Sequence, residues 1–181
     1  MQFVELPRLS SRFDDSQTSV LHGLSLAGKW AYIAHDDMFV MKPVDWIGPV
    51  VRGGLPVMSK RMARNQYYLR GDEARRWLIS QGVSKPWNYN VHVPFLCQSD
   101  LYLAVAERAR EAGLKAGYRA SMYGNLLRLP ALKVPDPKIT SNGVKPNART
   151  VCWSMSNPVW ENGMAGKMVR QRLTQPAPWE T

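Results

Sequence analysis

The sequence predicts an α/β protein, because segments patterned like strands alternate along the chain with segments patterned like helices. Residues 30–34, Trp-Ala-Tyr-Ile-Ala, have the length and the aromatic and β-branched content of a buried strand. Residues 100–112 form an amphipathic helical pattern that Ser99 can cap. Residues 151–155 are predicted to form a last core strand. Because no internal repeat or linker composition separates these segments, we expect a single domain over residues 1–181.

Two elements are predicted before the strand at 30–34. Residues 1–6 fit an edge strand that Pro7 ends. A helix follows and ends at Gly28, and three residues can cap its start: Asp14, Asp15 or Ser16. Its apolar residues share one face and are Val20, Leu21 and Leu24. This helix is expected to cover the strand that comes after it.

Loops and two helices are predicted in the middle of the chain. Residues 43–56 are rich in Pro and Gly, which is typical of turns. Residues 59–69 and 72–81 predict two separate helices, with Asp72 as the cap of the second. A short strand is expected at residues 91–95.

The C-terminal part combines an extended region with a helix. The prolines between residues 130 and 146 predict an extended course with little regular structure. A helix is predicted over residues 157–173, with Pro158 at its first position, where the missing N–H costs nothing. The tail after this helix is expected to be extended.

The composition fits a globular protein and limits the function classes. The chain has 24 Lys and Arg against 14 Asp and Glu, a formal net charge of +10, yet these charges are dispersed along the sequence. A basic surface of this kind suits a nucleotide diphosphate or an acidic partner as well as nucleic acid, and we do not expect a nucleic-acid-binding protein. The sequence lacks the Gly-x-Gly-x-x-Gly, P-loop, Gly-x-Ser-x-Gly and paired-cysteine motifs, which disfavours dinucleotide enzymes, P-loop ATPases, serine hydrolases and zinc fingers.

Localisation is predicted from the same features. No apolar run is long enough to span a bilayer, and the N-terminus lacks the pattern of a signal peptide. Neither Cys97 nor Cys152 has a metal-ligating companion at short spacing, so both are expected to be buried thiols. We therefore expect a protein of a reducing compartment, the cytoplasm.

The adjacent carboxylates Asp36 and Asp37 are the candidate metal site. They follow the predicted strand at 30–34, and two carboxylates at the end of a buried strand are costly unless a cation holds them. Hard oxygen ligands suit Mg²⁺ or Mn²⁺ carrying phosphate oxygens. The alternative is that the pair forms a turn or caps a helix.

Single histidines and arginines supply the other candidates. His92 can act as a general base or a metal ligand, with a hydrogen-bonded structural histidine as the alternative. His35 can ligate the metal or support its ligands. Arg12, Arg119 and Arg128 can each clamp a phosphate, with a solvated surface arginine as the alternative in each case.

Several segments, in order, resemble phage-encoded glycosyltransferases related to the Stealth-type sugar-phosphate transferases of capsule synthesis. These segments are Arg12-Phe-Asp-Asp-Ser-Gln-Thr, Tyr32-Ile-Ala-His-Asp-Asp-Met-Phe-Val-Met-Lys-Pro, His92-Val-Pro, Met122-Tyr-Gly-Asn with Asp136-Pro-Lys, and Gly163-Met-Ala-Gly through Val169-Arg to Pro178-Trp-Glu. The resemblance covers nearly the whole chain. Two positions depart from the family's pattern, because His35 stands where Asn is usual and Asp14-Asp15 where Arg-Asn is common.

The resemblance implies a GT-A-like α/β fold, a mixed sheet flanked by helices. It implies metal-dependent transfer of a sugar, or a sugar phosphate, from a nucleotide-sugar donor to a phage or bacterial surface acceptor. Asp36 and Asp37 would hold Mg or Mn and the donor diphosphate, with His92 and Asp37 as the catalytic residues. The residues implied to bind the donor or line the acceptor side are Arg12, Tyr123, Asn125, Asp136 and Lys138.

The resemblance also implies a longer N-terminal part that carries the first strands and much of the nucleotide pocket. Buried strands need neighbours, so we expect a sheet incomplete at its N-terminus, completed by a second polypeptide or by another copy in a homo-oligomer. The alternative function is a non-catalytic interaction protein or a virion-associated structural protein that retains a degenerate glycosyltransferase fold. The location would then be a virion instead of the bacterial host cytoplasm.

Overall fold

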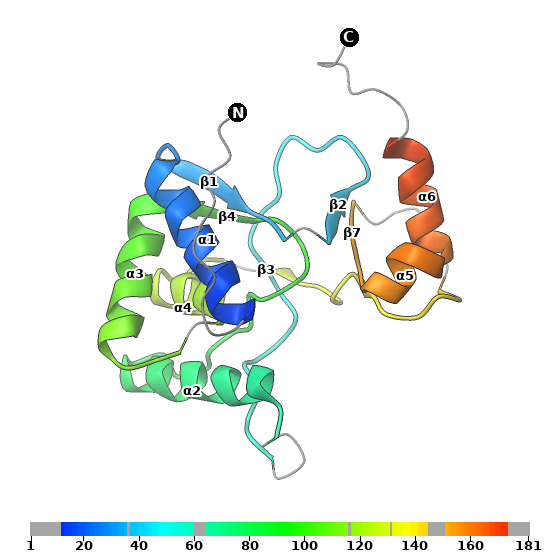
Figure 1. Ribbon diagram of the computed structural model, residues 1–181. Helices are drawn as coiled ribbons and strands as arrows, with labels where there is room; N and C mark the ends of the chain where they lie inside the picture. The colour runs from blue at the N-terminus through cyan, green and yellow to red at the C-terminus, as the bar shows by residue number, and fades with distance from the viewer. Residues whose placement is uncertain are drawn as a thin grey trace. The chain divides into compact units, whose positions relative to one another are not determined.

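The computed structural model of the chain divides into two compact units (Figure 1). The first consists of Met1–Ile33, Gly48–Asn90 and Phe95–Val134, and the second of Ala34–Ile47, Val91–Pro94 and Pro135–Thr181. The structure describes residues 12–35, 37–59, 64–115, 117–130, 132–144 and 151–173, and the side chains of those from 18 to 172. The predicted strand at 1–6 and the predicted extended tail lie outside the described residues.

The first unit packs four helices around short strands. The helices are α1 (Arg12–Leu26), α2 (Gln66–Ser80), α3 (Ser99–Glu111) and α4 (Arg119–Leu126). The strands are β1 (Trp30–Ile33), β3 (Val50–Val51), β4 (Phe95–Gln98) and β5 (Leu132–Lys133). β1 pairs antiparallel with β4, so that Trp30 lies opposite Gln98, while β3 pairs parallel with β5. In Figure 1, α1 to α4 gather around the β1–β4 pair.

The second unit is built on a three-stranded mixed sheet. Its strands are β2 (Met38–Val40), β6 (Lys138–Ile139) and β7 (Cys152–Met155), in the order β2-β7-β6. β7 pairs antiparallel with β2 and parallel with β6. Two helices, α5 (Asn157–Asn162) and α6 (Met164–Leu173), follow β7 directly. Their apolar side chains complete a core that includes Met155, Val159 and Val169.

The predicted α/β class is confirmed, together with several elements. α1 carries Val20, Leu21 and Leu24 into the core of the first unit. α3 forms at the predicted place, and Gly113 follows its end in the left-handed conformation (φ 74°) that glycine adopts without strain. Ser99 is not its cap, as was predicted, because it is the first helical residue and its hydroxyl donates to Gly28 O; Gln98 occupies the cap position. β7 is buried at every position, as expected of a core strand. Both cysteines are free and buried.

Four other local predictions were wrong. β1 forms but is buried on one face alone: Ala31 and Ile33 pack against the core, whereas Trp30 and Tyr32, on the opposite face, are exposed. The two helices expected at 59–69 and 72–81 are replaced by one helix, α2, and Asp72 lies inside it. Its cap is Asn65, whose Oδ1 accepts a hydrogen bond from Tyr67 N. The strand expected at 91–95 lies at Phe95–Gln98. The single helix expected at 157–173 is divided at Gly163 into α5 and α6.

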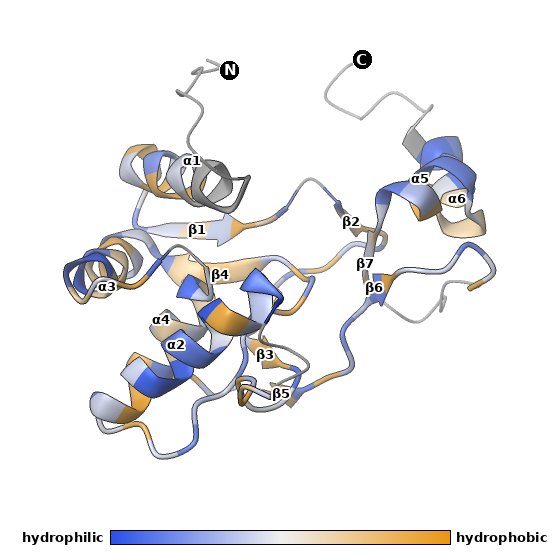
Figure 2. Cartoon of the chain, turned by 60° about the horizontal axis from the view of Figure 1, so that its bottom comes forward, coloured by the Kyte–Doolittle hydropathy of each residue, from blue (hydrophilic) through white to orange (hydrophobic). Residues whose placement is uncertain are grey.

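The core of the first unit is aromatic. Phe95 on β4 meets Tyr89 and Tyr123 edge to face, at ring-centroid distances of 6.2 and 5.9 Å. Figure 2 shows β4 as the hydrophobic strand of its pair, beside the more mixed β1. Leu78 of α2 and Met122 of α4 are almost fully buried against this cluster. The packing holds α2 and α4 side by side, which positions the loops at their ends.

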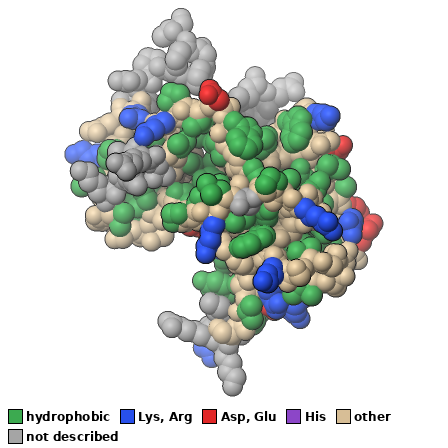
Figure 3. All heavy atoms as spheres, turned by 180° about the vertical axis from the view of Figure 1, so that it is seen from behind, with side chains coloured by type: hydrophobic (Ala, Val, Ile, Leu, Met, Phe, Trp, Pro, Cys, Tyr) green, Lys and Arg blue, Asp and Glu red, His purple; other side chains and the backbone are tan. Residues whose placement is uncertain are grey.

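The surface is basic without a single concentrated patch on the face shown in Figure 3, where Lys and Arg side chains are scattered among hydrophobic ones. None of the helices in the described part of the chain is long and apolar enough to cross a membrane.

Asp72 is a buried carboxylate inside α2. Burial alone would raise its pKa, but hydrogen bonds from Arg75 and from Met58 N, with the charges of Arg75 and Arg76, outweigh burial and lower the pKa. The Arg75 Nη2 to Asp72 Oδ1 distance is 2.7 Å. The ionised carboxylate therefore stabilises the first unit at neutral pH.

We predict that Asp72→Asn lowers the free energy of unfolding by about 1–3 kcal/mol at pH 7, because charge-assisted hydrogen bonds are lost. A lowered pKa contributes stability that is fully present above the unfolded value of about 3.9 and disappears as the pH falls through the folded value. Urea unfolding of both proteins from pH 7 to pH 3 should show the difference shrinking below about pH 4. Glu107→Gln, which breaks an exposed pair with Arg110, should leave the midpoint unchanged.

Candidate active site

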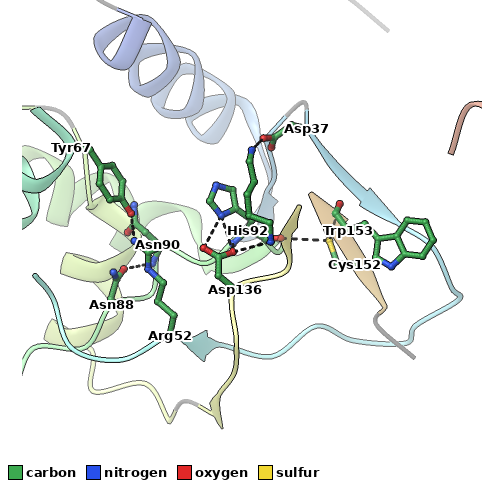
Figure 4. Close-up of polar contacts among 10 residues, drawn as sticks. Asp37, Arg52, Tyr67, Asn88, Asn90, His92, Asp136, Cys152 and Trp153 are labelled. Atoms are coloured by element: carbon green, nitrogen blue, oxygen red, sulfur yellow. Dashed lines mark hydrogen bonds and ion pairs between the residues drawn. The ribbon is translucent and has the colours of Figure 1, made fainter. Parts of the chain in front are cut away.

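His92 and Asp136 form a hydrogen-bonded pair in the second unit. His92 Nδ1 lies 2.8 Å from Asp136 Oδ1 and 3.0 Å from Oδ2 (Figure 4). An ionised carboxylate only accepts hydrogen bonds, so Nδ1 carries the proton and Nε2 is left as the acceptor. The His92 side chain is 31% exposed, and Figure 4 shows its second ring nitrogen directed away from Asp136. This is the arrangement of a general base whose tautomer a carboxylate fixes.

Backbone donors orient the carboxylate of Asp136. His92 N donates to Asp136 Oδ1 at 3.3 Å, and Lys138 N donates to the same oxygen at 3.4 Å. The carboxylate is therefore anchored to both segments that form the pair. This fixes the imidazole relative to the sheet, because Lys138 is the first residue of β6.

The sheet brings a second charged pair to the same segment. Asp37 immediately precedes β2, and its carbonyl oxygen accepts a hydrogen bond from Met155 N of β7 at 3.2 Å. Ser154 of β7 is paired with Met38 on one side and Lys138 on the other. This register places Asp37, just before β2, and Lys138 of β6 on the two sides of β7, and Lys138 Nζ forms an ion pair with Asp37 Oδ2.

The other carboxylate oxygen of Asp37, Oδ1, is buried and accepts no hydrogen bond from the described residues. A buried carboxylate oxygen without a donor is costly and is a natural position for a cation. Mg²⁺ is often held by one or two carboxylates and by substrate phosphates, so Asp37 Oδ1 fits as one ligand. Within the described residues, no three His, Cys, Asp or Glu side chains form a cluster that could hold a metal. Asp36, the second predicted ligand, lies outside the described residues, so its role stays a prediction.

Cys152 lies next to this group but is not a nucleophile. Its thiol is 3.8 Å from the carbonyl oxygen of His92. Burial, reinforced by the nearby charge of Asp37, raises the pKa of the thiol to about 11, although a backbone hydrogen bond from Phe39 acts in the opposite direction. The thiolate is the reactive form, so Cys152 stays inert at neutral pH and fills space behind the pair.

The remaining predicted site residues are placed elsewhere or are not described. Tyr123 and Asn125 belong to the first unit. The Tyr123 hydroxyl accepts a hydrogen bond from Gln98 N at 3.0 Å, and Asn125 uses its amide on the backbone of Trp87 and Ser121. Arg12 begins α1, but its side chain lies outside the described ones.

Sequence reasoning missed the ion pair between Asp37 and Lys138, although the sequence carried a signal for it. Asp136 and Lys138 are two residues apart in an extended segment, and residues at this spacing share one face. On that face, Asp136 can pair with one side chain, here His92, while Lys138 pairs with another, here Asp37. It was the pairing of β2 and β6 on either side of β7 that could not be read from the sequence.

The chain matches no protein-family model, no curated protein and no solved structure. The resemblance to phage-encoded and Stealth-type transferases, and the activity that it implies, therefore remain predictions. The chemistry of the site itself consists of a histidine base, two carboxylates and a lysine.

Proposed function

We propose that the chain is a glycosyltransferase-like protein of GT-A-like fold that moves a sugar, or a sugar phosphate, from a nucleotide-activated donor to an acceptor hydroxyl. The observation that carries this proposal is the contact of His92 Nδ1 with both oxygens of Asp136. Transfer to a hydroxyl requires a base, and a carboxylate-oriented histidine with an accessible second nitrogen meets that requirement. The sequence resemblance supplies the donor class.

The chain's own residues divide the work. His92 Nε2 accepts the proton of the acceptor hydroxyl while its oxygen forms the new bond to the transferred group, and the bond to the nucleotide oxygen breaks with its electron pair. Asp136 stabilises the imidazolium that results. Lys138 places a positive charge beside Asp37, where the donor's phosphates are expected, and favours an anionic leaving group.

Asp37 Oδ1, together with Asp36, would hold the divalent metal that the resemblance implies. When bound, Mg²⁺ or Mn²⁺ neutralises charge on the leaving diphosphate. The rest of the proposal does not depend on this ion, because the base and its carboxylate are complete within the described residues.

Thermal unfolding with Mn²⁺ and a panel of UDP- and GDP-sugars tests the proposal. We expect one donor to raise the melting temperature, because a ligand at 100 times its Kd stabilises the folded protein by about 2.7 kcal/mol. Asp37→Asn should abolish that shift. Asp45→Asn is the matched control, since Asp45 is an exposed carboxylate of the same unit.

The rival hypothesis, a non-catalytic interaction or virion-associated protein, predicts different results. No donor would shift the unfolding temperature, chelators would have no effect, and the protein would co-purify with a stable partner. A shift of equal size in Asp37→Asn and the parent would also reject the proposed donor site.

A further inference from the structure

A cavity of about 530 Å³ lies in the first unit, between the C-terminal ends of α2 and α4. This volume falls within the range of small-molecule sites. Its lining includes Lys85, Trp87, Arg128 and Ser84, and no Asp or Glu is among the described residues that line it. It belongs entirely to the unit that does not contain His92, so it is separate from the candidate active site.

Two cations face this cavity without a charged partner in the described part of the chain. Neither Lys85 nor Arg128 forms a described ion pair or side-chain hydrogen bond, in contrast to Arg75, Arg110 and Arg170. Two unpaired cations in one concave site repel each other and attract an anion. A phosphate group can accept hydrogen bonds from both.

Arg128 stands in a strained position. It follows the C-terminus of α4 with φ 51°, the left-handed conformation, and its N–H donates to Asn125 O at 3.1 Å. Leu129 N donates to Gly124 O at 2.9 Å, which completes the helix-ending motif in which glycine is the usual residue. An arginine in this position is conformationally less favourable than glycine. Its interaction with the helix C-terminus offsets part of that cost, and a ligand at the cavity would give its guanidinium a further role.

Trp87 places an aromatic surface at the cavity, and Asn125 holds its backbone. Asn125 Oδ1 accepts from Trp87 N at 2.8 Å, and Asn125 Nδ2 donates to Trp87 O at 2.7 Å. The Trp87 residue is nevertheless 45% exposed. An exposed indole beside two cations suits a ring that bears a phosphate, because the ring can stack on the indole while the cations bind the phosphate.

We propose that this cavity binds a phosphate monoester carried on a ring, with the phosphate on Lys85 and Arg128 and the ring on Trp87. A nucleotide and a sugar phosphate share this chemistry. The cavity is partly open, and its basic lining residues are Lys85 and Arg128. This favours a monomer over a nucleic-acid strand, because strand binding requires a longer basic track.

Isothermal titration of the full chain in about 0.15 M salt tests this proposal. The probes are uridine 5′-monophosphate, glucose 6-phosphate, uridine, glucose and inorganic phosphate. We expect at least one of the two phosphate monoesters to bind about tenfold or more tightly than its unphosphorylated counterpart and than inorganic phosphate, since charge-assisted hydrogen bonds and ring stacking both contribute. Which of the two binds identifies the source of the ring.

Arg128→Gly is the decisive variant, because it removes the guanidinium while placing the favoured residue at a left-handed position. It should fold at least as well as the parent and bind the monoester about tenfold or more weakly, and Lys85→Ala should weaken binding similarly. Lys133→Ala is the control, because Lys133 is an exposed lysine of β5 that does not line the cavity. This variant should bind the monoester as tightly as the parent does.

The proposal would be overturned if neither monoester bound. It would also be overturned if Arg128→Gly and Lys85→Ala bound the monoester as tightly as the parent does, or if the unphosphorylated rings bound equally well. Binding of a single-stranded oligonucleotide with a steep salt dependence, without binding of either monomer, would also overturn it and assign the cavity to a nucleic-acid surface.

Discussion

Replacing His92 by glutamine is expected to lower kcat for transfer by about 10²–10⁴-fold, the usual contribution of a positioned general base. Glutamine keeps a polar side chain at the site but cannot take up the proton of the acceptor hydroxyl. KM for the donor should change little, because His92 acts on the acceptor. The measurement is steady-state transfer with the donor that gives the thermal shift, over a range of pH.

Asp136→Asn tests how much the orientation of the base contributes, because it keeps His92 and changes the carboxylate that holds it. The amide can still contact Nδ1, but it cannot stabilise an imidazolium, and its own N–H favours the wrong tautomer. We expect a loss in kcat that approaches the His92→Gln value, with an altered pH profile. The melting temperature should fall only slightly, because the amide oxygen can still accept from His92 N and Lys138 N. His22→Gln, in α1 of the first unit, is the control. Full transfer activity in His92→Gln would remove the proposed role of the pair.

The local elements were predictable wherever the sequence contained both a pattern and a stop signal. α3 has Ser99 at its start and Gly113 after its end, and β7 is a short apolar segment at the expected place. The errors arose where tertiary packing overrode such signals. Asp72 was predicted to cap a second helix, but it pairs with Arg75 and Arg76 one turn later inside α2.

The sequence predicted which residues belong to the candidate site, but not which of them contact one another. Both His92 and Asp136 were candidates from the sequence, but 44 positions separate them, and periodicity carries no information on such a pairing. Asp37 and Lys138 are 101 positions apart and meet because β7 lies between their strands. Strand order is a property of the whole sheet, so a local reading assigned both aspartates to a metal and missed the contact of Asp37 with Lys138, although Lys138 was itself a candidate.

Gly166→Ala is expected to disrupt the packing of α5 against α6. A Cβ at this position would lie 2.6 Å from Val159 O and closer still to Trp160 O, and a backbone carbonyl cannot turn aside as a flexible side chain can. Alanine favours a helix over glycine by about 1 kcal/mol, but overpacking of this kind costs about 3 kcal/mol, so the clash decides the sign. The net loss should be about 2 kcal/mol or more in urea unfolding.

The close packing at Gly166 is connected to the candidate site through Trp160 and β2. Trp160 stacks on Phe39 of β2 at 5.2 Å, and Arg170 of α6 donates to Trp160 O. Displacing α6 therefore loosens the edge of the sheet that follows Asp37. Gly143→Ala is the matched control in the same unit, because nothing lies within 4 Å of its Cβ position, and it should change stability by less than about 0.5 kcal/mol. Equal stability of the two variants would show that α5 and α6 do not pack as closely as the contact at Gly166 requires.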